Sequence, residues 1–167
     1  MRLVVCDTGP FLHLSEVGQI ELLRQTGTVA IPSAVVDELD FHIPGWGLSK
    51  PDWVRIDALE PGATDQAIAW EASGILHLGE AESLALALQS KSDWYLTDDA
   101  AARIFALSLG LEVHGTVGVV LWAAGNGLAT RREAESMLDR LAVESSLWIS
   151  PRVVTEAKSA LDALCTD

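Results

Sequence analysis

Apolar residues in this chain form short continuous runs that alternate with longer stretches in which they recur every three or four positions. Short runs bounded by turn residues predict buried strands, and the wider spacing predicts amphipathic helices. Strands are expected at residues 2–6, 28–31, 53–57, 93–97 and 111–114. Helices are expected at residues 10–17, 19–25, 33–39, 64–72, 79–91 and 100–109, the third of them with Ser33 as its N-cap. Residues 41–52, which are rich in proline and glycine, are expected to form a loop. This alternation predicts an α/β fold with a parallel central sheet flanked by helices.

The C-terminal part of the chain carries helical signals only. One apolar helical face recurs through residues 117–124. A capping box at residues 130–133 and a Ser-Pro pair at 150–151 each mark the start of a further helix. We therefore expect one domain, in which residues 1–128 form the α/β part and residues 129–167 form a helical C-terminal extension.

Composition limits the classes of protein that fit. Hydrophobic residues make up 49% of the 167 positions, enough for a core, and no apolar run approaches the roughly 18 residues of a membrane helix. The formal net charge of −13 excludes broad, nonspecific nucleic-acid binding, which needs a basic surface, although it permits a nucleic-acid substrate at a local site. Cys6 and Cys165 indicate no disulfide framework, so we expect a cytoplasmic protein with no membrane partner.

Five acidic residues are the candidates for a functional site in this predicted parallel sheet. Asp7 follows the first apolar run, Asp98 and Asp99 follow a later one, and Glu38 and Glu80 lie in or at the start of expected helices. Residues just past the carboxyl ends of parallel strands meet in one crevice. Carboxylates crowded there lose solvation and repel one another, so a hard cation such as Mg²⁺ or Mn²⁺ is the expected compensating group. The simpler alternatives are a cap or turn role for Asp7, Asp98 and Asp99, a helix-dipole role for Glu80, and a solvated helix position for Glu38.

The ordered motifs around these acids resemble a known family. The motifs are DTGP at residues 7–10, VDEL at 36–39, LGEAESLALA at 78–87 and LTDDAAAR at 96–103. Together they resemble a PIN domain. The later segments GLEV at 110–113, GTVGVV at 115–120 and LWIS at 147–150 resemble its DUF3368-type, VapC-like subgroup. The resemblance covers nearly the whole chain.

The resemblance implies a three-layer PIN-like fold and a Mg²⁺- or Mn²⁺-dependent ribonuclease, often the toxin of a toxin–antitoxin pair. It carries the acidic positions over to Asp7, Glu38 and Glu80, and the fourth position to Asp98 or Asp99. Apart from the resemblance, Glu82 is either a further ligand or a residue that complements the helix dipole. It also implies an RNA substrate, a homodimer, and a small antitoxin whose tail enters the acidic groove. Residues 1–128 then correspond to the PIN-like nuclease domain.

Two other functions compete with the nuclease. A PIN-like binding module that holds a protein or RNA without cleaving it would explain the acidic surface and the glutamate at position 80. A receiver or phosphatase would also place acids at strand ends, but the first strand lacks a second aspartate and no lysine follows a late strand. The six tryptophans more often indicate packing or an interface than base stacking, although Trp46 in its loop is a candidate for stacking on RNA. Arg103 is expected either to pair with Asp99 or to contact a substrate phosphate.

Overall fold

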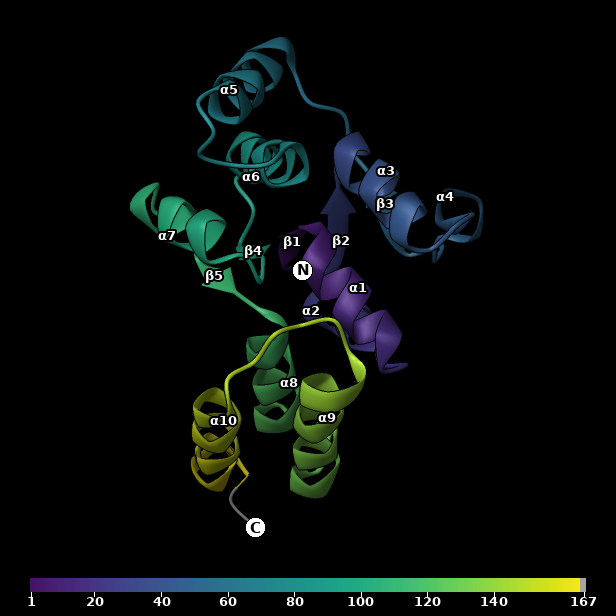
Figure 1. The fold of residues 1–167 in the computed structure, drawn as a ribbon, viewed down its shortest axis with the longest axis vertical. Helices are drawn as coiled ribbons and strands as arrows, with labels where there is room; N and C mark the ends of the chain where they lie inside the picture. Colours follow the sequence, from purple (N-terminus) through teal and green to yellow (C-terminus); the bar gives the residue numbers. More distant parts are fainter. Residues whose placement is uncertain (166–167) are drawn as a thin grey trace.

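The computed structural model describes residues 1–165 of the chain, and in that part it contains a five-stranded, all-parallel sheet and ten helices (Figure 1). The strands are β1 (Leu3–Cys6), β2 (Thr28–Ile31), β3 (Val54–Ile56), β4 (Trp94–Leu96) and β5 (Val113–His114). The helices are α1 (Thr8–Glu16), α2 (Glu21–Thr26), α3 (Ser33–His42), α4 (Trp46–Ser49), α5 (Pro61–Ala72), α6 (Leu78–Ser90), α7 (Ala100–Ser108), α8 (Thr116–Gly125), α9 (Arg131–Glu144) and α10 (Pro151–Leu164).

The strands lie in the order β3-β2-β1-β4-β5, so the first strand is central. The chain moves outward from β1 through β2 to β3, then returns across the sheet to β4 and β5 on the other side of β1. The direction of winding therefore changes between β1 and β4. Crevices at such switch points, at the carboxyl ends of the strands, are where open α/β sheets bind ligands.

Side chains of the central strands alternate between two buried clusters, which makes the fold three-layered. Val4 and Cys6 of β1 face the cluster that also holds α1, α2 and α8, whereas Val5 faces the cluster formed with α6 and α7. Ala30 of β2 and Tyr95 of β4 lie on the same side as Val5. Because both faces of the sheet are covered, the strands read as continuous apolar runs rather than alternating ones.

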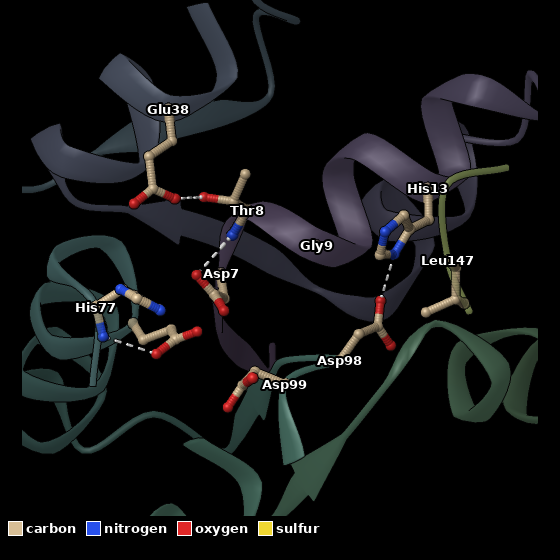
Figure 2. A pocket seen from close by; sticks show the side chains of 10 residues that line it. Asp7, Thr8, Gly9, His13, Glu38, His77, Asp98, Asp99 and Leu147 are labelled. Carbon is tan, nitrogen blue, oxygen red and sulfur yellow. Dashed lines mark hydrogen bonds and ion pairs between the residues drawn. The ribbon is translucent and has the colours of Figure 1, made fainter. Parts of the chain in front are cut away.

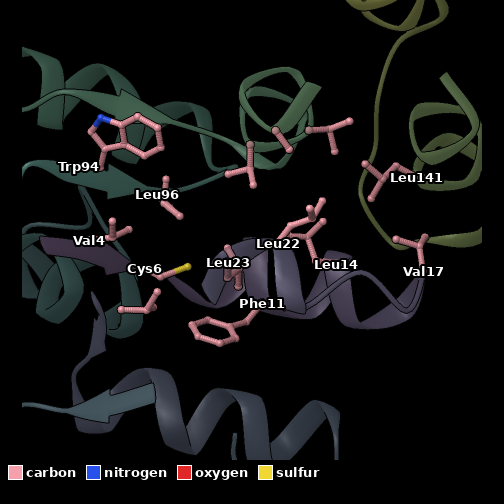
Figure 3. Packing of buried hydrophobic residues seen from close by; sticks show 14 of the residues in the cluster. Val4, Cys6, Phe11, Leu14, Val17, Leu22, Leu23, Trp94, Leu96 and Leu141 are labelled. Atoms are coloured by element: carbon pink, nitrogen blue, oxygen red, sulfur yellow. The ribbon is translucent and has the colours of Figure 1, made fainter. Parts of the chain in front are cut away.

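The C-terminal helices pack into the same core as the sheet. Leu138 and Leu141 of α9 and Leu161 of α10 belong to the cluster that contains Val4 and Phe11. Figure 3 shows Leu141 among the side chains of this cluster. Helices α8, α9 and α10 gather at one end of the molecule, and the loop between α9 and α10 runs back toward α1 (Figure 1). Two hydrogen bonds attach that loop to α1, since the backbone amide and the hydroxyl of Ser146 donate to Glu16 at 2.7 and 3.0 Å.

Two local expectations are wrong, whereas Trp46 has the packing role that is commoner for a tryptophan. Ser33 is not the N-cap of α3, because the preceding Pro32 occupies that position and the carboxylate of Glu82 accepts from the amide of Ala34 instead. The expected loop after residue 41 contains the short helix α4. Trp46, at the start of α4, is buried edge-on against Phe11 and has no face available for a nucleobase.

No helix among residues 1–165 is both long and apolar enough to cross a membrane.

Candidate active site

A cavity of about 380 Å³ lies at the carboxyl ends of β1 and β4 and contains all five predicted acids. It is lined by Asp7, Thr8, Gly9, His13, Glu38, His77, Glu80, Asp98, Asp99 and Leu147. The lining comes from the turns after β1 and β4, from α1 and α3, from the start of α6 and from the α9–α10 loop (Figure 2). Residues from one end of the sequence to the other therefore meet at the winding switch point.

Asp7 is the most buried of the acids, at 5% exposure. It is the N-cap of α1, where one carboxylate oxygen accepts from the amide of Thr8 at 2.7 Å. The other oxygen accepts from the hydroxyl of Thr97 at 2.9 Å. Burial nevertheless raises the pKa of Asp7 from 3.8 to about 7, with smaller contributions from the charges of Glu80 and Glu38. The two hydrogen bonds lower the pKa of Asp7 by less than burial raises it, and no positively charged group of the described chain adjoins this carboxyl to help them.

The two glutamates approach the cavity from helices on either side of Asp7. The carboxylate of Glu38 accepts from the hydroxyl of Thr8 and from the amide of Gly79 at 3.1 Å. Glu80 accepts from the amide of His77 at 2.9 Å, which closes a capping box at the start of α6. Burial raises the pKa of Glu80, and the nearby negative charge of Asp99 adds to the effect. Both glutamates thus rest on backbone donors while adding charge to the cavity.

Asp98 differs from its neighbours because its carboxylate is fully engaged by the protein. One oxygen accepts from the amide of Thr116 at 2.7 Å, and the other accepts from the Thr116 hydroxyl at 2.6 Å and lies 2.7 Å from Nδ1 of His13. Burial alone would raise the pKa of Asp98, but the hydrogen bonds from His13 and Thr116 outweigh it and hold that pKa below its ordinary value. Asp98 therefore joins α1 to the start of α8.

Asp99 keeps one carboxylate oxygen free of hydrogen bonds within residues 1–165. Its other oxygen accepts from the amide of Ala102 at 2.7 Å, so Asp99 is also the N-cap of α7. The expected ion pair between Asp99 and Arg103 is absent from the described part of the chain; the guanidinium of Arg103 donates instead to the carbonyl of Thr97 at 3.1 Å. The labelled carboxylates of Asp7 and Asp99 both turn into the cavity, whereas Asp98 faces His13 (Figure 2).

Glu82 lies outside the cavity lining. Its carboxylate accepts from the amide of Ala34 at 3.0 Å and lies 3.5 Å from the hydroxyl of Ser33. These contacts place a negative charge at the start of α3, where the helix dipole favours it. The geometry therefore gives Glu82 a capping role and separates it from Glu80, although the two are only two residues apart on α6.

The donor set of the cavity fits a hard cation in its chemistry. Apart from two histidines, its charged lining consists of five carboxylates, and no lysine or arginine is among the lining residues. Oxygen ligands and uncompensated negative charge are what Mg²⁺ and Mn²⁺ require. Within residues 1–165, however, no three Asp, Glu, His or Cys side chains converge on one point.

Sequence reasoning missed two residues that shape the site. His13 carries no motif, and its partner Asp98 is 85 positions away. Thr116 belongs to the GTVGVV segment, but its two hydrogen bonds to Asp98 depend on how α8 meets β4. The threonine of the DTGP motif and the threonine before Asp98 each donate to a carboxylate, since the hydroxyl of Thr8 bonds to Glu38 and that of Thr97 bonds to Asp7.

Comparison with protein families identifies the fold. The family model DUF3368, described as a PIN domain, matches residues 3–163. The match begins at β1, ends within α10 and includes every acid that lines the cavity. No curated protein matches the chain.

Proposed function

The chain belongs to the DUF3368 family of PIN domains, and from that premise we propose that it is a metal-dependent endoribonuclease that hydrolyses RNA phosphodiester bonds. PIN domains are generally nucleases and typically use divalent metals, so nuclease activity in general follows from the family. The observation that carries the finer proposal is the cavity itself, in which five carboxylates meet without a lysine or arginine.

We assign the metal-holding role to Asp7, Glu80 and Asp99, with Glu38 as a further ligand. Asp7 is buried without a compensating cation, and Asp99 retains an oxygen without a hydrogen bond among the described residues. The negative charges of Glu38 and Glu80 both act on Asp7. A bound Mg²⁺ or Mn²⁺ supplies a Lewis acid for the scissile phosphate and lowers the pKa of a bound water.

The other residues of the chain position these carboxylates. Thr97 and the amide of Thr8 hold the carboxylate of Asp7, and the hydroxyl of Thr8 holds Glu38 beside it. Asp98 is a positioning residue in this proposal, because its oxygens are occupied by Thr116 and by the ring of His13. It sets the conformation of the turn that carries Asp99.

The test is RNA cleavage by the purified chain with Mn²⁺, with EDTA, and in the variant Asp7→Asn. We expect metal-dependent cleavage that falls by roughly 100-fold or more in Asp7→Asn, since loss of even an outer-shell partner of a metal costs about 10–100-fold. Asp65→Asn is the matched control, because Asp65 is exposed on α5, outside the cavity lining. Equal cleavage by the chain and by Asp7→Asn would refute the assignment.

We further propose that the nuclease is the VapC-like toxin of a type II toxin–antitoxin pair in the cytoplasm. An acidic cavity of this kind suits an antitoxin tail that inserts an arginine or lysine. The proposed location rests on the two cysteines, which are both unpaired. Val143 of α9 and Leu164 of α10 are exposed apolar residues that would suit a homodimer surface. Growth arrest on expression, relieved by a neighbouring small reading frame, supports this pairing, and chromatography at several concentrations measures the dimer.

One observation favours a second function, a PIN-like module that binds RNA or protein without cleaving. Glu38 and Glu80 are both held by backbone amides, and no three candidate ligands converge within residues 1–165. Titration calorimetry with Mn²⁺ separates the two proposals. Metal binding by the chain that is lost in Asp7→Asn supports the nuclease, whereas equal and negligible heat in both proteins supports the binding module.

A further inference from the structure

A second cavity, of about 420 Å³, adjoins the acidic one. Asp98 and Leu147 line both cavities, so the two share a wall. The second cavity differs in character, because it is lined by Arg103 and by apolar residues such as Val153 and Trp148. A substrate that reaches the acids can therefore continue directly into a neighbouring space with an arginine and an aromatic ring.

Trp148 is the one exposed tryptophan among the six in the chain, with 85% of its surface accessible. The other five are buried or half-buried, and several pack on aromatic rings within the core. Trp148 lies on the α9–α10 loop, two residues after Ser146, whose hydrogen bonds to Glu16 attach that loop to α1. The fold thus holds a large flat ring at the rim of a cavity without covering it, and an uncovered aromatic face is a stacking platform.

Arg103 supplies the positive charge of this cavity. Its guanidinium donates to the carbonyl of Thr97 at 3.1 Å and forms no ion pair with any residue of the described chain. Gly115 leaves room for it, because a Cβ there would lie 2.6 Å from the Arg103 guanidinium and 2.7 Å from a carboxylate oxygen of Asp98. In a chain with a formal net charge of −13, Arg103 forms no ion pair among the described residues, although the Asp98 carboxylate lies nearby, and its positive charge beside the acidic cavity marks a place for an anion.

We propose that this second cavity binds a nucleotide next to the scissile phosphate of single-stranded RNA, with its base stacked on Trp148 and its phosphate on Arg103. The inference rests on the proposed ribonuclease function and specifies its substrate. A base inside a duplex is already stacked on its neighbours, so an aromatic platform selects unpaired nucleotides. A flat ring and a single cation suit one nucleotide, and the shared wall connects it to the next phosphate at the acids.

The test measures binding of a short, labelled single-stranded oligoribonucleotide by fluorescence anisotropy, in Mg²⁺ and in the Asp7→Asn background so that the RNA stays intact. Trp148→Ala should weaken binding roughly five- to 100-fold, the range of one base–aromatic stack. Trp148→Phe should retain most of the affinity while losing the quenching of tryptophan fluorescence that RNA causes. Leu48→Ala, at a residue that is 98% exposed on α4, is the matched control and should bind normally.

A second variant tests the phosphate contact independently. Arg103→Gln should make the logarithm of the binding constant less dependent on the logarithm of salt concentration, by a slope of about 0.7 for one phosphate on a single strand. Arg103→Lys keeps the charge and should restore the slope. An unchanged affinity in Trp148→Ala, an unchanged slope in Arg103→Gln, or no RNA binding by the parent chain would each overturn the proposal.

The subsite and the catalytic assignment fail in different ways. If the chain carrying Asp7 does not cleave RNA but Trp148→Ala still weakens binding in the Asp7→Asn background, the subsite stands and the nuclease is refuted. If that chain cleaves RNA and Trp148→Ala leaves both the KM and the binding constant unchanged, the nuclease stands and the subsite is refuted.

Discussion

Asp7 is the carboxyl whose ionisation costs the folded chain most, and replacing it should stabilise the metal-free protein. Its pKa is raised from 3.8 to about 7, mainly by burial. The folded state therefore holds a proton that the unfolded state releases between these two values. The stability that this proton confers is complete below pH 3.8 and is lost as the pH rises through about 7.

The magnitude follows from the difference between the two pKa values. Each unit of pKa is worth about 1.36 kcal/mol, so ionised Asp7 lowers the free energy of unfolding by about 4 kcal/mol above pH 7. Asp7→Asn removes that cost. Its amide oxygen can accept from the amide of Thr8 as the carboxylate does, and its NH₂ group can donate to the hydroxyl of Thr97. For a domain of this length the gain corresponds to roughly 10 °C in Tm.

Urea unfolding in EDTA at pH 5 and pH 8 measures the effect for the chain, for Asp7→Asn and for the exposed control Asp65→Asn. The stability of Asp7→Asn relative to the chain should rise from pH 5 to pH 8, while that of Asp65→Asn stays constant. Adding Mn²⁺ should stabilise the chain and leave Asp7→Asn almost unchanged. The reasoning is refuted if Asp7→Asn is no more stable than the chain at pH 8 in EDTA.

Three further substitutions have distinct expected outcomes. Gly79→Ala places a Cβ against the Glu38 carboxylate, so Mn²⁺ affinity in calorimetry should fall by roughly 10-fold, and unchanged affinity would exclude Glu38 as a ligand. Glu82→Ala should cost about 1 kcal/mol in urea unfolding through loss of a helix cap, with RNA cleavage intact; lost cleavage would return Glu82 to the site. Thr116→Val removes a hydroxyl that Asp98 accepts from and should cost about 1–3 kcal/mol, so an equally stable variant would contradict the bracing role.

The sheet and most of its helices were predictable because burial imposes a period on the sequence. The run before Asp7 is apolar at consecutive positions since Val4, Val5 and Cys6 face two different clusters, and that pattern requires a sheet covered on both sides. Element ends were less predictable. Ser33 has a suitable side chain for an N-cap. However, the carboxylate of Glu82, 49 positions away, accepts the hydrogen bond from the amide at the start of the helix.

Strand ends predicted that Asp7, Asp98 and Asp99 line the acidic cavity, and the family resemblance added Glu38 and Glu80, but the division of roles among the five was not predictable. Asp98 and Asp99 have the same side chain in adjacent positions, so only the contacts of Thr116 and His13 distinguish the engaged carboxylate from the open one. For Trp46 the sequence favoured packing, the commoner role of a tryptophan, and left stacking on RNA as the alternative. Its burial against Phe11 is a tertiary contact that local sequence does not encode.

The central place of β1 has a consequence for the order in which a growing chain acquires its parts. β1 is made first, but its second neighbour β4 begins at Trp94, and Thr116, which holds Asp98, comes later still. A ribosome that stops between residues 81 and 93 releases a peptide that has Asp7, Glu38 and Glu80 but lacks the strand that carries Asp98 and Asp99 to them. Interrupted synthesis therefore yields fragments without a complete acidic cavity, and the carboxylates are held together only after Thr116 has been added.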